Sequence, residues 1–288
     1  MTDRLGRADL HVHTLASDGT AGVLEILAHV QRIGTLDVIA ITDHERIDAA
    51  LAARAVARDE GLPFDVIVGE EVTTRGGHLL ALFVESPVRP LRSMRETIAR
   101  IHDQGGLAIP AHPLFPFPMC AQGSTLRRLV ADADPNVRPD ALEAFNPTTF
   151  GRPHRRVVAL AEELGLAVVG SSDAHAVGAV GQGYTTFPGR TAEDLRLAVV
   201  ARQTHWHGSF HRMAPQLATF ARQLRKYSRD ASAIVRGGVL RNGTGRDLGY
   251  PGGHRRPAAF DAEAARPGLS ASSGQGLGRG RGRDETLR

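Results

Sequence analysis

The feature that most restricts the fold of this chain is a regular alternation of short apolar runs with helical segments. Apolar runs such as 37–41 and 107–110 are separated by segments of helical periodicity such as 22–33 and 48–59. Strands that alternate with helices of this length pair mainly in parallel, because each crossover is a helix. The sequence therefore predicts an α/β fold with a mainly parallel sheet.

The same periodicity gives the expected elements and their boundaries. We expect strands at 8–13, 37–41, 65–68, 79–84, 107–110, 140–145 and 167–170, and helices at 22–33, 48–59, 93–104, 155–164 and 192–201. The segment 113–123 contains three prolines and is expected to be a loop. We expect His205 and His207 to lie on a closing strand rather than at a metal site.

The carboxyl-terminal part of the chain has a different composition. Residues 215–235 show an amphipathic helical pattern that can pack on the body, on a partner or on an anionic surface, with the body favoured. Residues 237–288 contain 13 glycines and a G-R-G-R-G-R run, so this tail is expected to be disordered. The predicted organisation is a domain over 1–212, a helix over 213–236 and a tail over 237–288.

Charge and cysteine content narrow the class of protein. The net charge is +4, yet residues 229–288 hold 11 arginines and 6 acidic residues, so the excess lies in the tail and the body is near neutral. A single cysteine, Cys120, excludes an intrachain disulfide, and we expect a structural role for it. No apolar run is long enough to span a membrane and the first residues are polar, so a cytoplasmic location is expected.

Histidine and carboxylate residues follow the apolar runs at their carboxyl ends. His11 and His13 are two positions apart, so in a strand both side chains point to one face and can bind one cation together. The carboxyl ends of strands are where α/β proteins assemble their sites. The other members of this set are Asp18, Asp43, His44, Glu70, Glu71, His78, His112, Asp173 and His175.

Such a set is explained best by divalent metal. Each aspartate alone could cap a helix and each histidine alone could be a core residue, but burial of the whole set without partners would be very costly. Imidazole and carboxylate without thiolate suit Zn, Mn or Fe. Two cations about 3.5–4 Å apart can acidify a bridging water and hold the attacking and leaving oxygens of a displacement at phosphorus. A metal-bridged hydroxide is therefore the expected nucleophile.

The motifs in their order resemble the PHP (polymerase and histidinol phosphatase) superfamily over roughly residues 8–207. They are D-L-H-V-H-T at 9–14, S-D-G-T at 17–20, T-D-H at 42–44, G-E-E-V-T at 69–73, G-H at 77–78, P-A-H-P at 110–113 and S-D-A-H at 172–175. The resemblance implies a distorted (β/α)7 TIM-like barrel that holds two or three divalent metal ions. It also implies hydrolysis of phosphoric ester bonds.

The resemblance also implies three adjoining sites. His11, His13, Glu71 and Asp173 would hold one metal. Glu71 would bridge to a second metal, held also by His78 and His112, and Glu70 is the alternative bridge. Asp18, His44 and His175 would hold a third.

Three further residues are candidates for catalysis. Asp43 is the candidate for a carboxylate that orients a ligand imidazole. Arg46 and Arg152 are the favoured contacts to substrate phosphate, because guanidinium groups match phosphate oxygens. Other arginines near the motifs are Arg75, Arg155 and Arg156.

These observations lead to one main hypothesis and two alternatives. The main hypothesis is a phosphoesterase acting on nucleotides or nucleic-acid 5′ ends, as a 5′–3′ exonuclease or nucleoside-bisphosphate phosphatase, since the motifs look more like the small trpH-like group of the superfamily. One alternative is a small-molecule phosphatase of the histidinol-phosphatase type. The other is a nucleic-acid-binding or regulatory module with structural metal, in which the basic tail makes weak, non-specific contacts.

Overall fold

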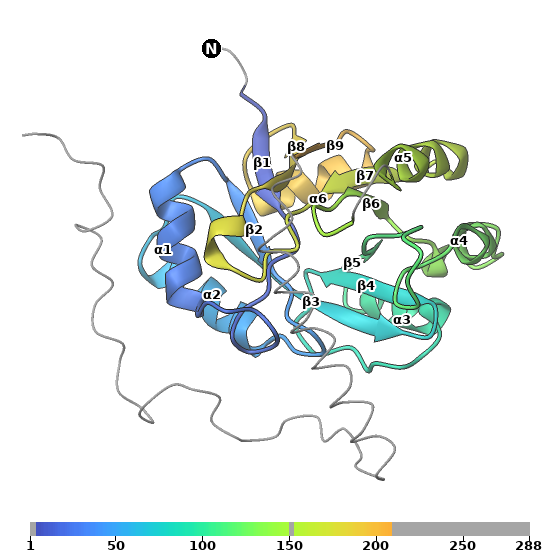
Figure 1. Ribbon diagram of the computed structural model, residues 1–288, viewed down its shortest axis with the longest axis horizontal. Helices are drawn as coiled ribbons and strands as arrows, with labels where there is room; N and C mark the ends of the chain where they lie inside the picture. Colours follow the sequence, from blue (N-terminus) through green and yellow to red (C-terminus); the bar gives the residue numbers. More distant parts are fainter. Residues whose placement is uncertain (1–3, 150–152, 209–288) are drawn as a thin grey trace, which may run out of the picture.

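Strands and helices alternate along the part of the chain that the computed structural model describes, residues 4–149 and 153–208 (Figure 1). The strands are β1 (Gly6–Asp9), β2 (Val38–Ile41), β3 (Asp65–Thr74), β4 (Gly77–Leu82), β5 (Leu107–Pro110), β6 (Ala141–Phe145), β7 (Ala167–Gly170), β8 (Gly183–Phe187) and β9 (His205–Gly208). The α-helices are α1 (Val23–Ile33), α2 (Asp48–Asp59), α3 (Met94–His102), α4 (Gly123–Val130), α5 (Pro153–Leu164) and α6 (Ala192–Val200). Two 3₁₀ turns, Pro135–Val137 and Val177–Ala179, complete the described elements.

Two sheets together make a curled half-barrel. The larger sheet has the order β5-β4-β3-β2-β1-β8-β9, and β6 pairs with β7 in a second sheet. The second sheet lies against both ends of the first: Asp140 N donates to Ala108 O of β5, and Gly170 N of β7 donates to Thr185 Oγ1 of β8, at 3.0 and 2.9 Å. Helices lie around the outside of the curl (Figure 1). The α/β class is therefore confirmed.

The expectation of a mainly parallel sheet is wrong. In the larger sheet only β1–β2 and β2–β3 are parallel, whereas β3–β4, β4–β5, β1–β8 and β8–β9 are antiparallel. The reason lies partly in the connection of β3 to β4, which is a turn of only two residues, Arg75 and Gly76. A turn of this length can only join antiparallel neighbours.

Several element boundaries also differ from the sequence-based prediction. Strand β3 runs to Thr74 rather than to residue 68, because its second half pairs with β4. Strand β1 ends at Asp9, before the first two histidines. Helix α4 and strand β8 were not expected from the apolar pattern, whereas β9 confirms the expected strand at His205 and His207. The predicted helix over 213–236 and tail over 237–288 lie outside the described residues.

The core lies on both faces of the sheet. In β2, Val38 and Ala40 belong to the apolar cluster inside the curl, and Ile39 and Ile41 face the helices, as the strand period of two requires. Helix α6 packs against the inner cluster, and Ala192 N donates to the Asp65 carboxylate where β3 begins. Apolar packing and a helix therefore fill the edge at which the parallel strands begin, and the opposite edge is left for polar groups.

A histidine outside the polar edge supplies a pH-dependent contact. His102 Nδ1 lies 2.8 Å from Asn136 O and its Nε2 lies 2.9 Å from Asp140 Oδ2, so both ring nitrogens face acceptors. Burial lowers the pKa of His102, but the Asp140 carboxylate outweighs it and the pKa is raised. A raised folded-state pKa stabilises the fold below the unfolded pKa, and this stabilisation is lost as pH rises through the folded value.

We therefore expect His102→Gln to destabilise the protein more in mild acid than in mild alkali. The difference in free energy of unfolding from the parent chain should be about 1 kcal/mol larger near pH 5.5 than near pH 8.5, as for hydrogen bonds to charged groups. Urea denaturation at the two pH values measures it. His29→Gln, at a half-buried histidine whose pKa is lowered by burial and Arg32, is the control. An equal cost at both pH values would contradict the assignment.

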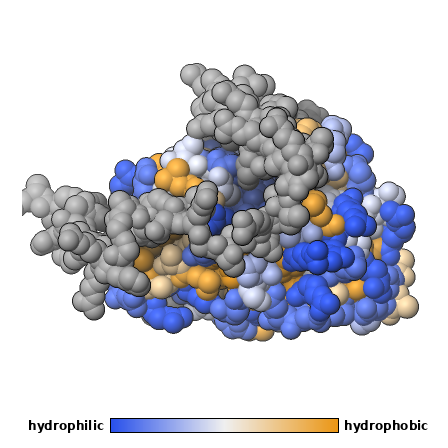
Figure 2. Space-filling model, turned by 90° about the horizontal axis from the view of Figure 1, so that it is seen from below, coloured by the Kyte–Doolittle hydropathy of each residue, from blue (hydrophilic) through white to orange (hydrophobic). Residues whose placement is uncertain are grey.

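The surface of the described residues is mixed in character. Figure 2 shows mainly hydrophilic residues over the described part of one face, with hydrophobic residues in smaller groups between them. Large exposed apolar side chains include Leu15, Leu197 and Val200. No helix among the described residues has the length and apolar character needed to cross a bilayer.

Candidate metal centre

The chain beyond β1 is held extended by backbone pairing with the segment that follows β7. His13 N donates to Ala174 O at 2.9 Å, and Ala174 N donates to His11 O at 3.1 Å. This pairing places His11 and His13 on one face, as the sequence predicts, and brings Asp173 beside them. Both imidazoles are at most 1% exposed. The edge of the curled sheet therefore gathers groups that are more than 160 residues apart in the chain.

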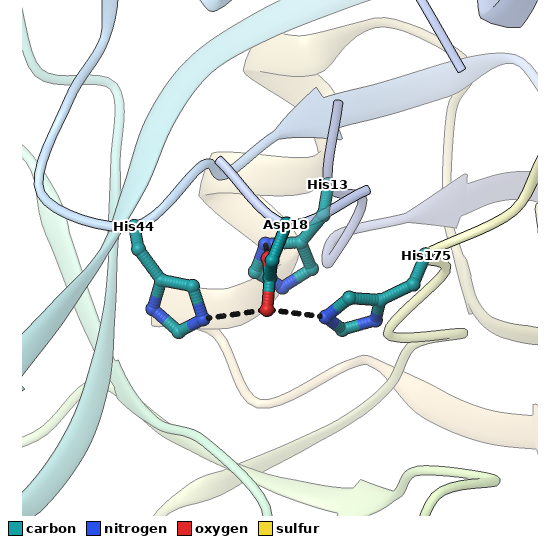
Figure 3. Close-up of side chains that lie close together, drawn as sticks. All are labelled: His13, Asp18, His44 and His175. Carbon is teal, nitrogen blue, oxygen red and sulfur yellow. Dashed lines mark hydrogen bonds and ion pairs between the residues drawn. The ribbon is translucent and has the colours of Figure 1, made fainter. Parts of the chain in front are cut away.

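Asp18 is brought back over the same edge by a tight turn. A Cβ atom on Gly19 would lie 2.5 Å from His13 O, so this turn requires glycine. Asp18 Oδ2 lies 3.2 Å from His175 Nε2 and 3.6 Å from His44 Nε2 (Figure 3). Its other oxygen lies 3.4 Å from His13 Nδ1. One carboxylate thus faces three imidazoles from three different segments.

Glu71 occupies the middle of the centre. Its Oε2 lies 3.2 Å from His11 Nε2 and 3.3 Å from His13 Nε2. Its Oε1 lies 2.7 Å from His78 Nδ1 and 3.2 Å from His112 Nε2. Glu71 Oε2 also lies 3.5 Å from His44 Nδ1. One oxygen of the carboxylate therefore faces three imidazoles, and the other oxygen faces a separate pair.

Glu70, the alternative to Glu71, points elsewhere. Strand residues alternate between faces, and the Glu70 carboxylate accepts a hydrogen bond from Val88 N. Burial raises the pKa of Glu70 to about 8. Glu70 makes no contact with an imidazole among the described residues, so the geometry selects Glu71.

Asp173 completes the group around the first two histidines. Its Oδ1 lies 3.4 Å from His11 Nε2, 3.3 Å from His13 Nε2 and 3.5 Å from His175 Nδ1. Asp173 has φ = 49° and His112 has φ = 33°, in the left-handed region that side chains other than glycine rarely adopt. Strained backbone of this kind is typical of functional sites, where surrounding structure holds it in place.

A further carboxylate of the centre, Glu143, was not predicted from the sequence. It lies on β6, is buried, and its Oε1 accepts from His11 Nδ1 at 3.0 Å. Its Oε2 accepts from His112 N at 2.6 Å and from Asn146 Nδ2 at 3.0 Å. Asn146 Nδ2 also donates to Asp173 Oδ2 at 3.2 Å. The signal in the sequence is a lone acidic residue within the apolar run A-L-E-A-F, a position where an unpartnered charge would be costly.

We expect Glu143→Gln to weaken metal binding by about 10- to 100-fold, the usual cost of losing a carboxylate that orients a ligand imidazole. The amide keeps the size of the side chain but loses the charge that holds the His11 Nδ1 proton. Competition with a chromophoric chelator measures the metal Kd. Glu25→Gln on α1, outside this network, is the control. An unchanged Kd in Glu143→Gln would contradict the role.

Cys120 is buried beside His112. Its Sγ lies 3.2 Å from His112 Nδ1, which leaves His112 Nε2 toward Glu71. The surrounding 113–122 segment is a loop, as predicted, and His78 N donates to Met119 O at 2.8 Å. The position fits the expected structural role for Cys120 and adds a contact to an imidazole.

The three candidate catalytic residues have different surroundings. Asp43 accepts from Thr14 N and Thr14 Oγ1 at 2.8 and 2.7 Å and from Ser17 Oγ. Asp43 therefore contacts no imidazole directly, but Ser17 Oγ lies 3.4 Å from His13 Nδ1. Arg46 pairs with Asp48 and donates to Ala16 O, so it borders the Asp18 turn with its guanidinium already engaged. Arg152 lies outside the described residues.

Burial and neighbouring groups of the centre shift the pKa values of its histidines and carboxylates. Burial lowers the pKa of His13, but the carboxylates of Asp18, Asp173 and Glu71 outweigh it and raise the pKa to about 10. Burial raises the pKa of Glu71, but the imidazoles of His78, His44 and His11 hold it well below its usual range. Burial dominates for His44 and lowers its pKa to about 4. The centre thus favours ionised carboxylates.

The donor geometry fits metal ions. Around an ion with bonds of about 2.0–2.2 Å, neighbouring donor atoms lie about 2.8–3.6 Å apart, which matches most of the separations here. Three groups have all their donor atoms within 4.8 Å of one another: His13, Asp18, His44 and His175; His11, His13 and Asp173; and His44, Glu71 and His78. His13 Nε2 is buried and has no hydrogen-bond partner among the described residues. The residues present can therefore hold divalent cations.

Comparison with known proteins identifies relatives of the whole fold and of parts of the chain. Residues 151–204 match the PHP-associated family. The uncharacterized protein MJ1587 of Methanocaldococcus jannaschii is 33% identical over 121 residues, which cover 38% of this chain and 69% of that protein. The 5′-3′ exoribonuclease Rnm of Salmonella typhimurium is 46% identical over 68 residues, 23% of this chain and 22% of Rnm.

A solved structure from Bacteroides vulgatus has the same fold. It is a two-domain protein containing a predicted PHP-like metal-dependent phosphoesterase. The TM-score is 0.59 at 20% identity, and the match covers 72% of this chain and 65% of that one. PsfC from Pseudomonas syringae matches with a TM-score of 0.54 at 20% identity over 78% of this chain and 99% of its own.

Proposed function

The chain belongs to the PHP superfamily, and from this premise we propose that it is a metal-dependent phosphoesterase that acts on nucleotides or nucleic-acid 5′ ends. The observation that carries the proposal is the position of Glu71, whose two oxygens face separate sets of imidazoles, three on one side and two on the other. The similarity to an exoribonuclease over 68 residues supports a nucleic-acid substrate, cleaved as a 5′–3′ exonuclease or nucleoside-bisphosphate phosphatase. In the same proposal, the curled sheets are a distorted (β/α)7 barrel within a domain over 1–212.

We assign nine residues to two or three divalent ions, Mn, Zn or Fe. The first group is His11, His13, Glu71 and Asp173; the second is Glu71, His78 and His112; the third is Asp18, His44 and His175. Divalent cations in such a centre supply Lewis acidity toward a phosphoryl oxygen and acidify water for attack at phosphorus. No serine or cysteine nucleophile is then required.

The protein groups around the ligands orient them. Glu143 accepts the Nδ1 proton of His11, so that His11 Nε2 faces Glu71. Asp43 holds the chain at Thr14 and, through Ser17, restrains His13. Both carboxylates are buried, which keeps bulk water from the backs of the imidazoles. Preorganisation of this kind fixes the donor atoms before substrate binds. Phosphate contact by Arg46 and Arg152 remains a prediction.

A screen that detects both inorganic phosphate and free mononucleotides tests the proposal. Purified full-length protein with Mn or Zn should release phosphate from nucleotides, or mononucleotides from short oligonucleotides, with sugar phosphates as the comparison class. Replacing His11 and Asp173 together with alanine should abolish the release, because both face His13 at the centre. Full activity of this double variant would contradict the assignment. Release from sugar phosphates alone would contradict the nucleic-acid substrate and keep the phosphoesterase.

A further inference from the structure

Outside the metal centre, a groove lined by several arginines lies along α3 and the segment that leads into it. It encloses about 560 Å³. Helix α3 lies near the β3–β4 hairpin (Figure 1). Arginine is the main source of charge in its lining, with two acidic residues between. The charged lining residues are Arg89, Arg92, Arg95, Glu96, Arg100 and Asp103.

Two of these arginines form no ion pair among the described residues, although Arg92 interacts with Glu96 at longer range. Arg95 pairs with Asp132 at 2.9 Å, and Arg100 pairs with Asp103 at 3.3 Å. By contrast, no ion pair joins Arg89 or Arg92 to any residue in the described ranges. The groove therefore presents unneutralised positive charge, and guanidinium groups bind phosphate oxygens with matching geometry.

The one glutamate in the groove lining is already hydrogen-bonded to the helix end. Glu96 accepts from Ser93 N at 3.1 Å and from Ser93 Oγ at 2.8 Å, in the capping box that begins α3. These hydrogen bonds direct its carboxylate to the helix end, where a negative charge is favourable. Glu96 therefore neutralises Arg92 less than a free glutamate would.

Backbone hydrogen bonds connect this groove to the metal centre. The segment leading into α3 runs beside β3: Leu91 N donates to Thr73 O at 2.7 Å, and Arg75 N donates to Arg92 O at 2.9 Å. Thr73 pairs in register with His78. Arg75 is exposed at the hairpin turn and adds a third cation, with its Nε bonded to Leu91 O.

The distance between the metal centre and the arginine groove restricts the length of a ligand that can contact both. Arg75 lies four positions after Glu71 along the strand and its turn, a path of about 13 Å. A mononucleotide phosphate held at Glu71 is too short to reach Arg92 as well, whereas a chain of phosphodiesters can contact both. We infer that Arg75, Arg89 and Arg92 bind the phosphate backbone of a single nucleic-acid strand whose end lies at the metal centre. This inference rests on the proposed function and specifies a polymeric substrate.

The test compares two full-length variants in which three arginines are replaced by glutamine. The first carries Arg75→Gln, Arg89→Gln and Arg92→Gln. The matched control carries Arg32→Gln, Arg58→Gln and Arg138→Gln, which removes the same charge from exposed positions near the ends of α1 and α2 and before β6, at the opposite edge. For each, kcat/KM is measured with Mn on a 5′-phosphorylated oligonucleotide of about 12 nucleotides, within the usual site size of single-strand grooves, and on p-nitrophenyl phosphate.

The ratio of the two kcat/KM values should fall about tenfold in the groove variant and stay at the parent value in the control. Because each lost phosphate contact on a single strand changes the salt slope by about 0.7, the slope of log KM against log salt should fall by about 2. Equal ratios and slopes in both variants would overturn the groove assignment. Absence of both phosphate and mononucleotide release in the parent chain would instead overturn the proposed function, so the two failures are distinguishable.

Discussion

Glu71→Gln is expected to abolish metal-dependent phosphate release, with a loss greater than the roughly 100-fold that removal of an outer orienting carboxylate costs. The substitution keeps the shape of the side chain and removes the charge that five imidazoles share. A neutral amide is a much poorer ligand for Zn or Mn than a carboxylate. Steady-state phosphate release and metal content of the purified variant measure the effect.

The neighbouring residue gives a closely matched control. Glu70→Gln changes the same chemical group one position away, at a side chain that contacts Val88 N and no imidazole among the described residues. Since burial raises the pKa of Glu70 to about 8, it is largely neutral at pH 7 and glutamine should replace it with little change. Glu70→Gln should therefore keep metal and activity. Similar losses in both variants would show that Glu71 is not the bridging ligand.

Removal of metal should produce the second large effect, on stability. Three carboxylates and six imidazoles lie at one edge, and without cations the carboxylates repel one another. A ligand at 1,000 times its Kd stabilises the folded state by about 4 kcal/mol, so unfolding in EDTA should be easier by about that amount. Urea unfolding of the full chain, with and without excess Mn or Zn, measures the difference.

The control for this effect is the variant that lacks the shared carboxylate. Glu71→Gln should show a clearly smaller difference in stability between EDTA and excess metal, because only the group of Asp18, His44 and His175 keeps all its ligands. Ionic-strength effects are matched by adding Mg and Ca salts to parallel samples. A parent chain whose unfolding is the same in EDTA and in Mn or Zn would contradict a metal-coupled fold.

Much of the fold could be predicted because local patterns encode it. Periodicities of 2 and 3.6 place β2, α1 and α2 correctly, and the α/β class follows from their alternation. Strand direction was predicted less well. The β3–β4 hairpin and the antiparallel β8 depend on a short turn and on tertiary pairing, which apolar runs alone do not distinguish from parallel strands.

The candidate site, like the fold, could be predicted only in part from the sequence. The structure brings together all nine residues of the predicted ligand set. Most of them follow or end a recognisable apolar run, whereas His78 stands at the beginning of β4 and reaches the same edge because β4 is antiparallel to β3. Glu143, Asn146 and Cys120 were not anticipated as contacts to those ligands, because their roles come from neighbours on other strands and loops. Single-sequence reasoning identifies residues by their own segment, and contacts between segments become visible only in the folded chain.

The central claim is that Glu71 and its surrounding histidines form a metal centre that hydrolyses phosphoric esters. A titration of phosphate release against bound metal per chain tests it most directly. We expect no release of phosphate or mononucleotide from metal-free protein, and a rise that reaches its plateau when two or three Mn or Zn ions are bound per chain. Metal-free protein that is fully active, or protein that binds these ions and hydrolyses none of the tested esters, would contradict this assignment.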